Sequence, residues 1–113
     1  MKSSFITFFA VLSVASIFSL ASAQGNPNSA NFLLSGCRDI QNPDSDASYK
    51  EGFCSGAIWA LAHSLPGVCT PQGVAIPQVG AVVVRYIEQA PQRWHENFMA
   101  LASEALRKTW PCR

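Results

Sequence analysis

Hydrophobic residues recur at helical spacing in four stretches of the chain, separated by segments rich in proline, glycine and polar residues. The stretches are 29–37, 49–65, 77–90 and 92–110. Residues three and four apart lie on one face of a helix, so each stretch can present an apolar face to a common core. The pattern predicts an all-α fold, a small bundle of about four helices in which consecutive helices are antiparallel neighbours.

Local signals define two of the predicted helix starts. Ser48 and Glu51 form an S-x-x-E pattern, in which the serine side chain accepts a hydrogen bond from the N3 amide and the glutamate accepts one from the amide of the serine. This pattern predicts a helix that begins at Tyr49. Pro77 suits the first turn of the third helix, because a proline there has no N–H to lose.

Three small residues, Gly52, Gly56 and Ala60, lie four apart in the second predicted helix. This spacing puts them on one side of the helix, where each glycine costs about 1 kcal/mol relative to alanine. Close packing against a second helix can offset that cost. We expect this contact to be with another helix of the same chain, in preference to a seam between two copies.

The N-terminus has the sequence pattern of a secretory signal peptide. Lys2 is followed by an uncharged apolar run at 5–20 and by Ala-Ser-Ala at 21–23, a small-residue cleavage site. The apolar run is short for a membrane span, and no charged stop follows it. We therefore predict that 1–23 is cleaved on export, that 24–113 is a single helical domain, and that the mature protein has no stable membrane anchor.

The charge balance narrows the class of partner. The chain has 8 Lys and Arg against 7 Asp and Glu, and loss of Lys2 with the leader makes the two equal. Proteins that bind nucleic acid or anionic membranes electrostatically need an excess of basic residues. The composition therefore predicts no nucleic-acid partner and favours a protein partner.

Four cysteines in an exported chain indicate two disulfides, for which three pairings exist. Cys37 ends the first predicted helix and Cys54 lies early in the second, while Cys69 precedes the third and Cys112 follows the fourth. Antiparallel neighbours bring the members of each pair together, so we prefer Cys37–Cys54 with Cys69–Cys112. No two cysteines have the close spacing typical of structural zinc sites, so we expect no metal.

The sequence offers no catalytic constellation. His63 and His95 could be imagined beside Ser55 or Ser64 and a carboxylate, but no nucleophile motif such as G-x-S-x-G accompanies them. His63 near the end of its helix suits the negative end of the helix dipole. We predict that the protein is not an enzyme and needs no cofactor.

Two polar segments are candidate partner-binding surfaces. The predicted loop 38–48 carries Asp44 and Asp46, which could meet a basic groove on a partner. The corner between the third and fourth helices is the second segment, and its candidate residues are Gln92, Arg93, His95 and Glu96. Any of the three tryptophans that proves exposed would suit an interface anchor.

Several short motifs together resemble one protein family. They are F-C-S-G (Phe53 to Gly56), C-T-P-Q-G-V (Cys69 to Val74), Q-V-G-A-V-V-V-R-Y-I (Gln78 to Ile87), Pro91, and A-L-x-x-x-W-P-C (Ala105 to Cys112). Through these motifs the chain resembles, from about Leu33 to Cys112, the Rap/Tai-type immunity proteins of bacterial type VI secretion.

The resemblance implies a small helical protein of the periplasm, often a homodimer, that binds a secreted peptidoglycan amidase effector and blocks its active site. It implies no enzyme activity. It also implies that the four cysteines form disulfides, that Gly56 is a packing glycine, and that Pro71, Pro91 and Pro111 punctuate the helices. The alternative function is that of a small periplasmic stress protein or chaperone, which would dissociate and bind clients at low pH.

Overall fold

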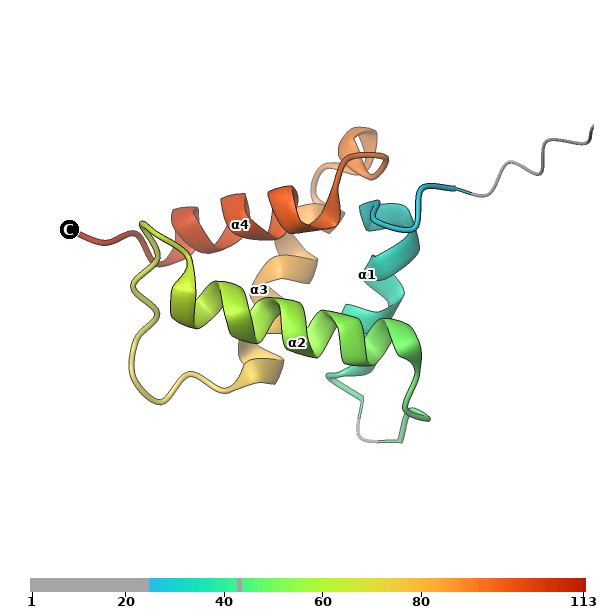
Figure 1. Ribbon diagram of the computed structural model, residues 1–113, viewed down its shortest axis with the longest axis horizontal. Helices are drawn as coiled ribbons and strands as arrows, with labels where there is room; N and C mark the ends of the chain where they lie inside the picture. The colour runs from blue at the N-terminus through green and yellow to red at the C-terminus, as the bar shows by residue number, and fades with distance from the viewer. Residues whose placement is uncertain (1–24, 43) are drawn as a thin grey trace, which may run out of the picture.

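The computed structural model describes residues 25–42 and 44–113, and the predicted signal peptide 1–23 lies outside these residues (Figure 1). The described residues form four α-helices and one short 3-10 helix, so the predicted all-α fold with four helices is confirmed. The elements are α1 (Ala30–Asp39), α2 (Tyr49–Ser64), α3 (Ile76–Glu88), η1 (Pro91–Arg93) and α4 (Phe98–Thr109).

The helices are not arranged as a simple up-and-down bundle. In Figure 1, α2 and α4 run in the same direction, and α1 and α3 cross them steeply. Two of the crossings are close because a glycine lies at the contact. A Cβ at Gly36 in α1 would fall on the main-chain carbonyl of Lys50, and a Cβ at Gly80 in α3 would lie 2.6 Å from Cδ1 of Ile40. The expected antiparallel packing of consecutive helices is therefore wrong.

The core is formed by one face of every helix. The face of α2 that is buried carries Cys54, Ile58, Leu61 and Ala62. The sequence pattern predicts an apolar face of Phe53, Ala57, Ala60, Leu61 and Ser64, widened by Ile58, Ala62 and Leu65. Ile58, Leu61 and Ala62 are buried as predicted, but Ala60 and Ser64 are exposed, Phe53, Ala57 and Leu65 are half-buried, and the centre of the buried face is shifted toward Cys54. The difference follows from the disulfide, because Cys54 is bound to α1 and the residues four, seven and eight positions later then also face the core.

The small-residue strip of α2 is the second correction. Gly52 and Gly56 are exposed, and a Cβ built at either would meet nothing within 4 Å. No helix among the described residues therefore packs against the strip, contrary to our expectation. The close helix contacts that glycines allow in this fold occur at Gly36 and Gly80.

The corner between α3 and α4 also differs from prediction. The fourth helix begins at Phe98 rather than near residue 92, because Asn97 caps it and accepts a hydrogen bond from the amide of Ala100 at 3.2 Å. The preceding turn binds the start of α1 instead. The amides of Ala30 and Asn31 donate to the carbonyls of Glu96 and Trp94, respectively, which satisfies donors that a helix start leaves free.

Two disulfides connect these elements, Cys37–Cys54 between α1 and α2 and Cys69–Cys112 between the α2–α3 loop and the C-terminal segment. Their Cα atoms lie 5.3 Å and 5.0 Å apart. These are the pairs that the sequence favours. In the part of the chain that the structure describes, no helix is both long and apolar enough to cross a membrane.

Candidate functional site

The α2–α3 loop is fixed at its base by the C-terminal segment. Its Cys69 forms the second disulfide, and the amide of Cys69 donates to the carbonyl of Trp110 at 2.8 Å. The amide of Cys112 returns a hydrogen bond to Gly67, whose φ of 84° is in the left-handed region that glycine tolerates. The disulfide and the two hydrogen bonds fix the conformation of the loop at its base.

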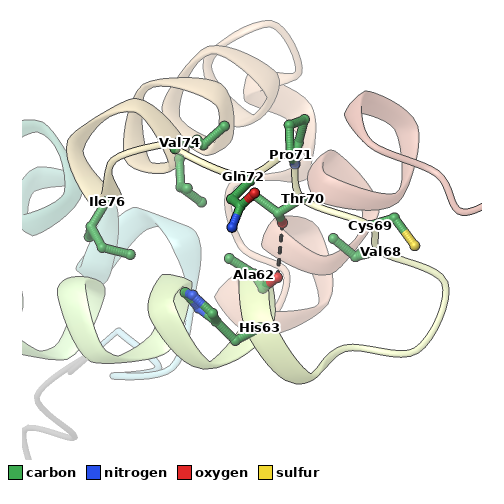
Figure 2. Close-up of a pocket in the computed structure, with 11 residues that line it drawn as sticks. Ala62, His63, Val68, Cys69, Thr70, Pro71, Gln72, Val74 and Ile76 are labelled. Carbon is green, nitrogen blue, oxygen red and sulfur yellow. Dashed lines mark hydrogen bonds between the residues drawn. The ribbon is translucent and has the colours of Figure 1, made fainter.

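This loop covers a pocket of about 430 Å³ beside the end of α2 (Figure 2). Hydrophobic side chains from the loop and α3 line part of it, and they are Val68, Val74, Ile76 and Val79. Three polar residues also line it. Thr70 donates its hydroxyl to the carbonyl of Ala62 at 2.9 Å, while His63 and Gln72 are exposed.

His63 has the contacts of a structural residue. Its Nδ1 lies 2.8 Å from the carbonyl oxygen of Trp59, and its ring stacks on that of Trp59 with centroids 4.7 Å apart. A carbonyl can only accept, so Nδ1 carries the proton in this hydrogen bond. The partner of His63 is thus a main-chain oxygen and an indole, rather than the carboxylate that would orient a catalytic histidine.

The outer face of α2 is unusually apolar for an exposed helix surface. Tyr49 is 73% exposed and Trp59 is 55% exposed, and these are the exposed large hydrophobic side chains of the described residues. The exposed glycines, Gly52 and Gly56, lie between them on the same helix. We call the set Tyr49, Gly52, Gly56, Trp59, Ala60 and His63 the α2 outer face. Trp59 is therefore the exposed tryptophan, whereas Trp94 and Trp110 are half-buried.

The predicted corner is held by one arginine. Arg93 donates through Nε and Nη2 to both carboxylate oxygens of Glu96, at 2.6 Å and 2.9 Å. It also donates to both oxygens of Glu104 in α4, at 2.8 Å and 3.0 Å. The hydroxyl of Tyr86 in α3 donates to Glu104 at 2.9 Å. One guanidinium thus ties η1 to α4 and, through Glu104, to α3.

The pKa values of the groups in this network shift as the contacts require. Hydrogen bonds from Arg93, and then from Tyr86, lower the pKa of Glu104 from 4.5 to about 2. The hydrogen bonds from Arg93 also lower the pKa of Glu96. In return the carboxylates of Glu104 and Glu96 raise the pKa of Arg93. These charges are engaged with one another, so they stabilise the corner.

The structure separates the two predicted partner-binding segments. The loop that follows α1 begins at Ile40 rather than at Arg38, and Asp44 and Asp46 are exposed on it. Gln92 and His95 are exposed at the corner, where Arg93 and Glu96 are only half-exposed. Figure 1 places the loop and the corner on opposite sides of the molecule, so they do not form one site.

Sequence reasoning missed both the pocket at the α2–α3 loop and the α2 outer face as surfaces. The signal for the outer face was present, because Tyr49 and Trp59 flank the glycine strip at helical spacing. The pocket depends on how a loop folds over α2 and α3, for which the sequence has no periodic signal. Among the described residues, no group of three or more His, Cys, Asp or Glu side chains could hold a metal ion.

The fold and its surfaces define a small helical domain that is linked by two disulfides and exposes an apolar helix face. The model of the Rap1a immunity protein family matches residues 29–112, which include all four helices and both disulfides. The chain therefore belongs to the Rap1a immunity protein family. No curated protein and no solved structure matches the chain.

Proposed function

We propose that the protein is a periplasmic immunity protein that binds a peptidoglycan amidase effector of type VI secretion and occludes its active site. The observation that carries this proposal is the match of the Rap1a immunity family to the whole helical fold, residues 29–112. The two disulfides fit an oxidising compartment such as the periplasm. The protein would act by steric blocking and would catalyse nothing itself.

The α3–α4 corner is suited to enter a cleft. Its turn is held by the Arg93 contacts to Glu96 and Glu104, and the indole Nε1 of Trp94 donates to the carbonyl of Ile87 at 2.7 Å. A segment that is already ordered loses little conformational entropy on binding. Gln92 and His95 are the exposed residues that would contact the effector, while Arg93 and Glu96 would keep the turn in shape.

The α1–α2 loop is the second candidate for the contact. Asp44 and Asp46 are exposed and take part in none of the salt bridges of the described residues, so their charges are available to a basic partner surface. Because the loop and the corner lie on opposite sides, variants can separate them. Charge reversal at Asp44 and Asp46 tests the loop, and Gln92→Ala with His95→Ala tests the corner.

Periplasmic co-expression tests the function itself. The reading frame beside the gene for this protein should encode a secreted peptidoglycan amidase, and cells that make this amidase in the periplasm should lyse unless the protein is made with it. Lysis with both proteins well expressed in the periplasm would overturn the proposal. A variant lacking residues 1–23, which stays in the cytoplasm, should give no protection.

The homodimer that the family resemblance implies would form through the α2 outer face. In an antiparallel two-fold crossing centred on Gly56, the positions equally far from the centre face each other. Gly52 then meets Ala60, Phe53 meets Trp59, and Tyr49 meets His63 of the second copy. Small residues would allow a close approach and the aromatic residues would pack on one another, without any charged pair on the face.

Analytical ultracentrifugation tests the dimer. We expect concentration-dependent dimers for the wild-type protein and monomers for Gly56→Glu. All four native cysteines are in disulfides, so Gly56→Cys should give a disulfide-linked dimer at the two-fold axis, whereas Gln89→Cys, at the residue that follows α3, should not. If the wild-type protein stays monomeric over a 100-fold range of concentration, this dimer is excluded. That result would say nothing about effector binding.

A further inference from the structure

A groove of about 470 Å³ runs between α3 and the end of α4, apart from both the pocket and the α2 outer face. Ala81, Val82 and the ring of Tyr86 supply its apolar surface. The remaining lining residues are Gln78, Arg85 and Thr109. Gln78, Ala81, Val82 and Arg85 follow one another at helical spacing on the side of α3 opposite the buried valines.

Two cations border this groove. Arg85 lines it and is exposed, and Nζ of Lys108 lies 5.2 Å from the centroid of the Tyr86 ring. Neither cation belongs to a salt bridge among the described residues. Arg85 and Lys108 are therefore free to pair with a carboxylate from outside.

The nearest carboxylates of this chain are engaged elsewhere. Glu88, one turn beyond Arg85, accepts a hydrogen bond from Nε of Arg38 at 2.7 Å. Glu104, one turn before Lys108, accepts two from Arg93 and one from Tyr86. The groove thus has a positive rim on which Arg85 has no salt-bridge partner among the described residues and Lys108 interacts with Glu104 only through its charge.

The acidic side chains without a salt-bridge partner come from a different part of the chain than the groove does. The carboxylates outside the three salt bridges all come from the segment 39–51, and they are Asp39, Asp44, Asp46 and Glu51. Arg107, Lys108 and Arg113 belong to the opposite end, where α4 leads into the C-terminus (Figure 1). Arg85 and Lys108 therefore border a groove that has none of these four carboxylates among its lining residues.

We propose that the α3–α4 groove binds an acidic segment of the effector, with a carboxylate paired to Arg85 and Lys108 and an apolar side chain on Ala81, Val82 and Tyr86. This inference rests on the proposed function and names a surface for it. The groove is continuous with the corner, because Tyr86 lines the groove and also bonds the Glu104 carboxylate that holds Arg93. One effector can therefore contact the corner and the groove together.

The occupant is a protein segment for reasons of charge and shape. Attraction to an anionic membrane surface takes a cluster of about four to eight basic residues, and this groove has two. A protein segment that brings one or two carboxylates and one apolar side chain matches the two cations and the apolar floor. Such pairing across an interface steers association and sets its specificity.

Titration calorimetry of the full mature protein with the purified neighbouring amidase tests the proposal. We expect the double variant Arg85→Glu/Lys108→Glu to bind about tenfold more weakly or worse, because two attractive contacts become repulsive. Raising the NaCl concentration from about 50 to 300 mM should weaken binding by the wild type and strengthen binding by the variant, since salt screens attraction and repulsion between exposed charges alike. The far-ultraviolet circular dichroism of the variant should stay that of the wild type, while its melting temperature should fall slightly, because each glutamate lies in the last turn of a helix.

A second variant adds a carboxylate to a residue that lines the groove, and it should keep the fold intact. Ala81→Glu places a carboxylate four residues before Arg85, where the two stabilise a helix by about 0.2–0.5 kcal/mol. It should weaken effector binding to a similar degree, while Gln72→Glu, which adds the same charge outside the groove, should not. Wild-type affinity for both groove variants overturns the groove and leaves the immunity function standing, whereas absence of binding by the wild type overturns both.

Discussion

A Cβ atom at Gly36 would fall on the main-chain carbonyl of Lys50, so α1 and the start of α2 touch backbone to backbone. Gly36 and Cys37 are adjacent, and Cys37 is bonded to Cys54 one turn further along α2. The glycine and the disulfide therefore fix the same crossing, one by removing a side chain and the other by a covalent bond. No other pair of elements in the described chain approaches this closely at a glycine.

The contact predicts opposite effects for two glycine substitutions. Gly36→Ala should lower the free energy of unfolding by about 2 kcal/mol, because overpacking a tight contact typically costs 1–3 kcal/mol. Gly56→Ala should raise it by up to about 1 kcal/mol, because alanine is the better helix former and its Cβ meets nothing. Urea unfolding at protein concentrations too low for self-association measures both, and equal effects would refute the crossing.

Asn97 should be worth about 1 kcal/mol as the cap of α4. Asn97→Ala removes the acceptor of the Ala100 amide and should lower the free energy of unfolding by that amount. Asn97→Asp keeps an acceptor at the same place and should remain close to the wild type. Urea unfolding of the three proteins at neutral pH provides the comparison, and an aspartate variant as unstable as the alanine variant would argue against capping.

The N-cap of α2 and the proline of α3 show which parts of the fold were predictable. Both signals act within one turn of the chain, and the structure has Ser48 accepting from the amide of Glu51 and Pro77 in the first turn of α3. The second hydrogen bond of the capping box, from the amide of Ser48 to the side chain of Glu51, was also predicted. The structure does not show it, since Oε2 of Glu51 is buried without a hydrogen-bond partner. Local chemistry thus predicted helix starts more reliably than the side-chain bonds around them.

The start of α4 and the buried face of α2 show what the sequence could not reveal. Residues 92–97 continue a helical apolar pattern through Trp94, but Trp94 instead bonds the end of α3 and Arg93 bonds Glu104 in α4. The buried face of α2 is set by the disulfide to α1. In both cases contacts between residues far apart in sequence outweigh the helical spacing of apolar residues. The candidate partner-binding surfaces also depend on contacts of this kind, so the sequence alone does not define them.

The Arg93–Glu104 contact predicts a loss of stability in acid. The pKa of Glu104 is about 2 in the folded protein, below its ordinary 4.5, so the folded state favours the charged carboxylate. Its contribution to stability is complete above pH 4.5 and is lost as the pH falls toward 2. Glu104→Gln should flatten the pH dependence of the urea midpoint over this range. If plots of urea midpoint against pH stay parallel for the two proteins, Glu104 contributes nothing to the loss of stability in acid.

The two disulfides should differ sharply in how fast a reductant reaches them. Cys37 and Cys54 are 0% exposed, whereas Cys69 and Cys112 both lie at the surface. Limiting dithiothreitol followed by alkylation and mass spectrometry should therefore label Cys69 and Cys112 first. Cys37 and Cys54 should be labelled only as fast as the whole domain unfolds.

The burial difference affects rate, while the loop lengths predict similar losses of stability. The chain-entropy estimate is about 4 kcal/mol for the 43-residue separation of Cys69 and Cys112, and about 3 kcal/mol for the 17-residue separation of Cys37 and Cys54. Alanine pairs at either bridge should therefore destabilise the domain by comparable amounts, with a further loss at the buried pair from the cavity left there. Equal labelling rates for the two bridges in the wild type would contradict the burial that the structure assigns to Cys37 and Cys54.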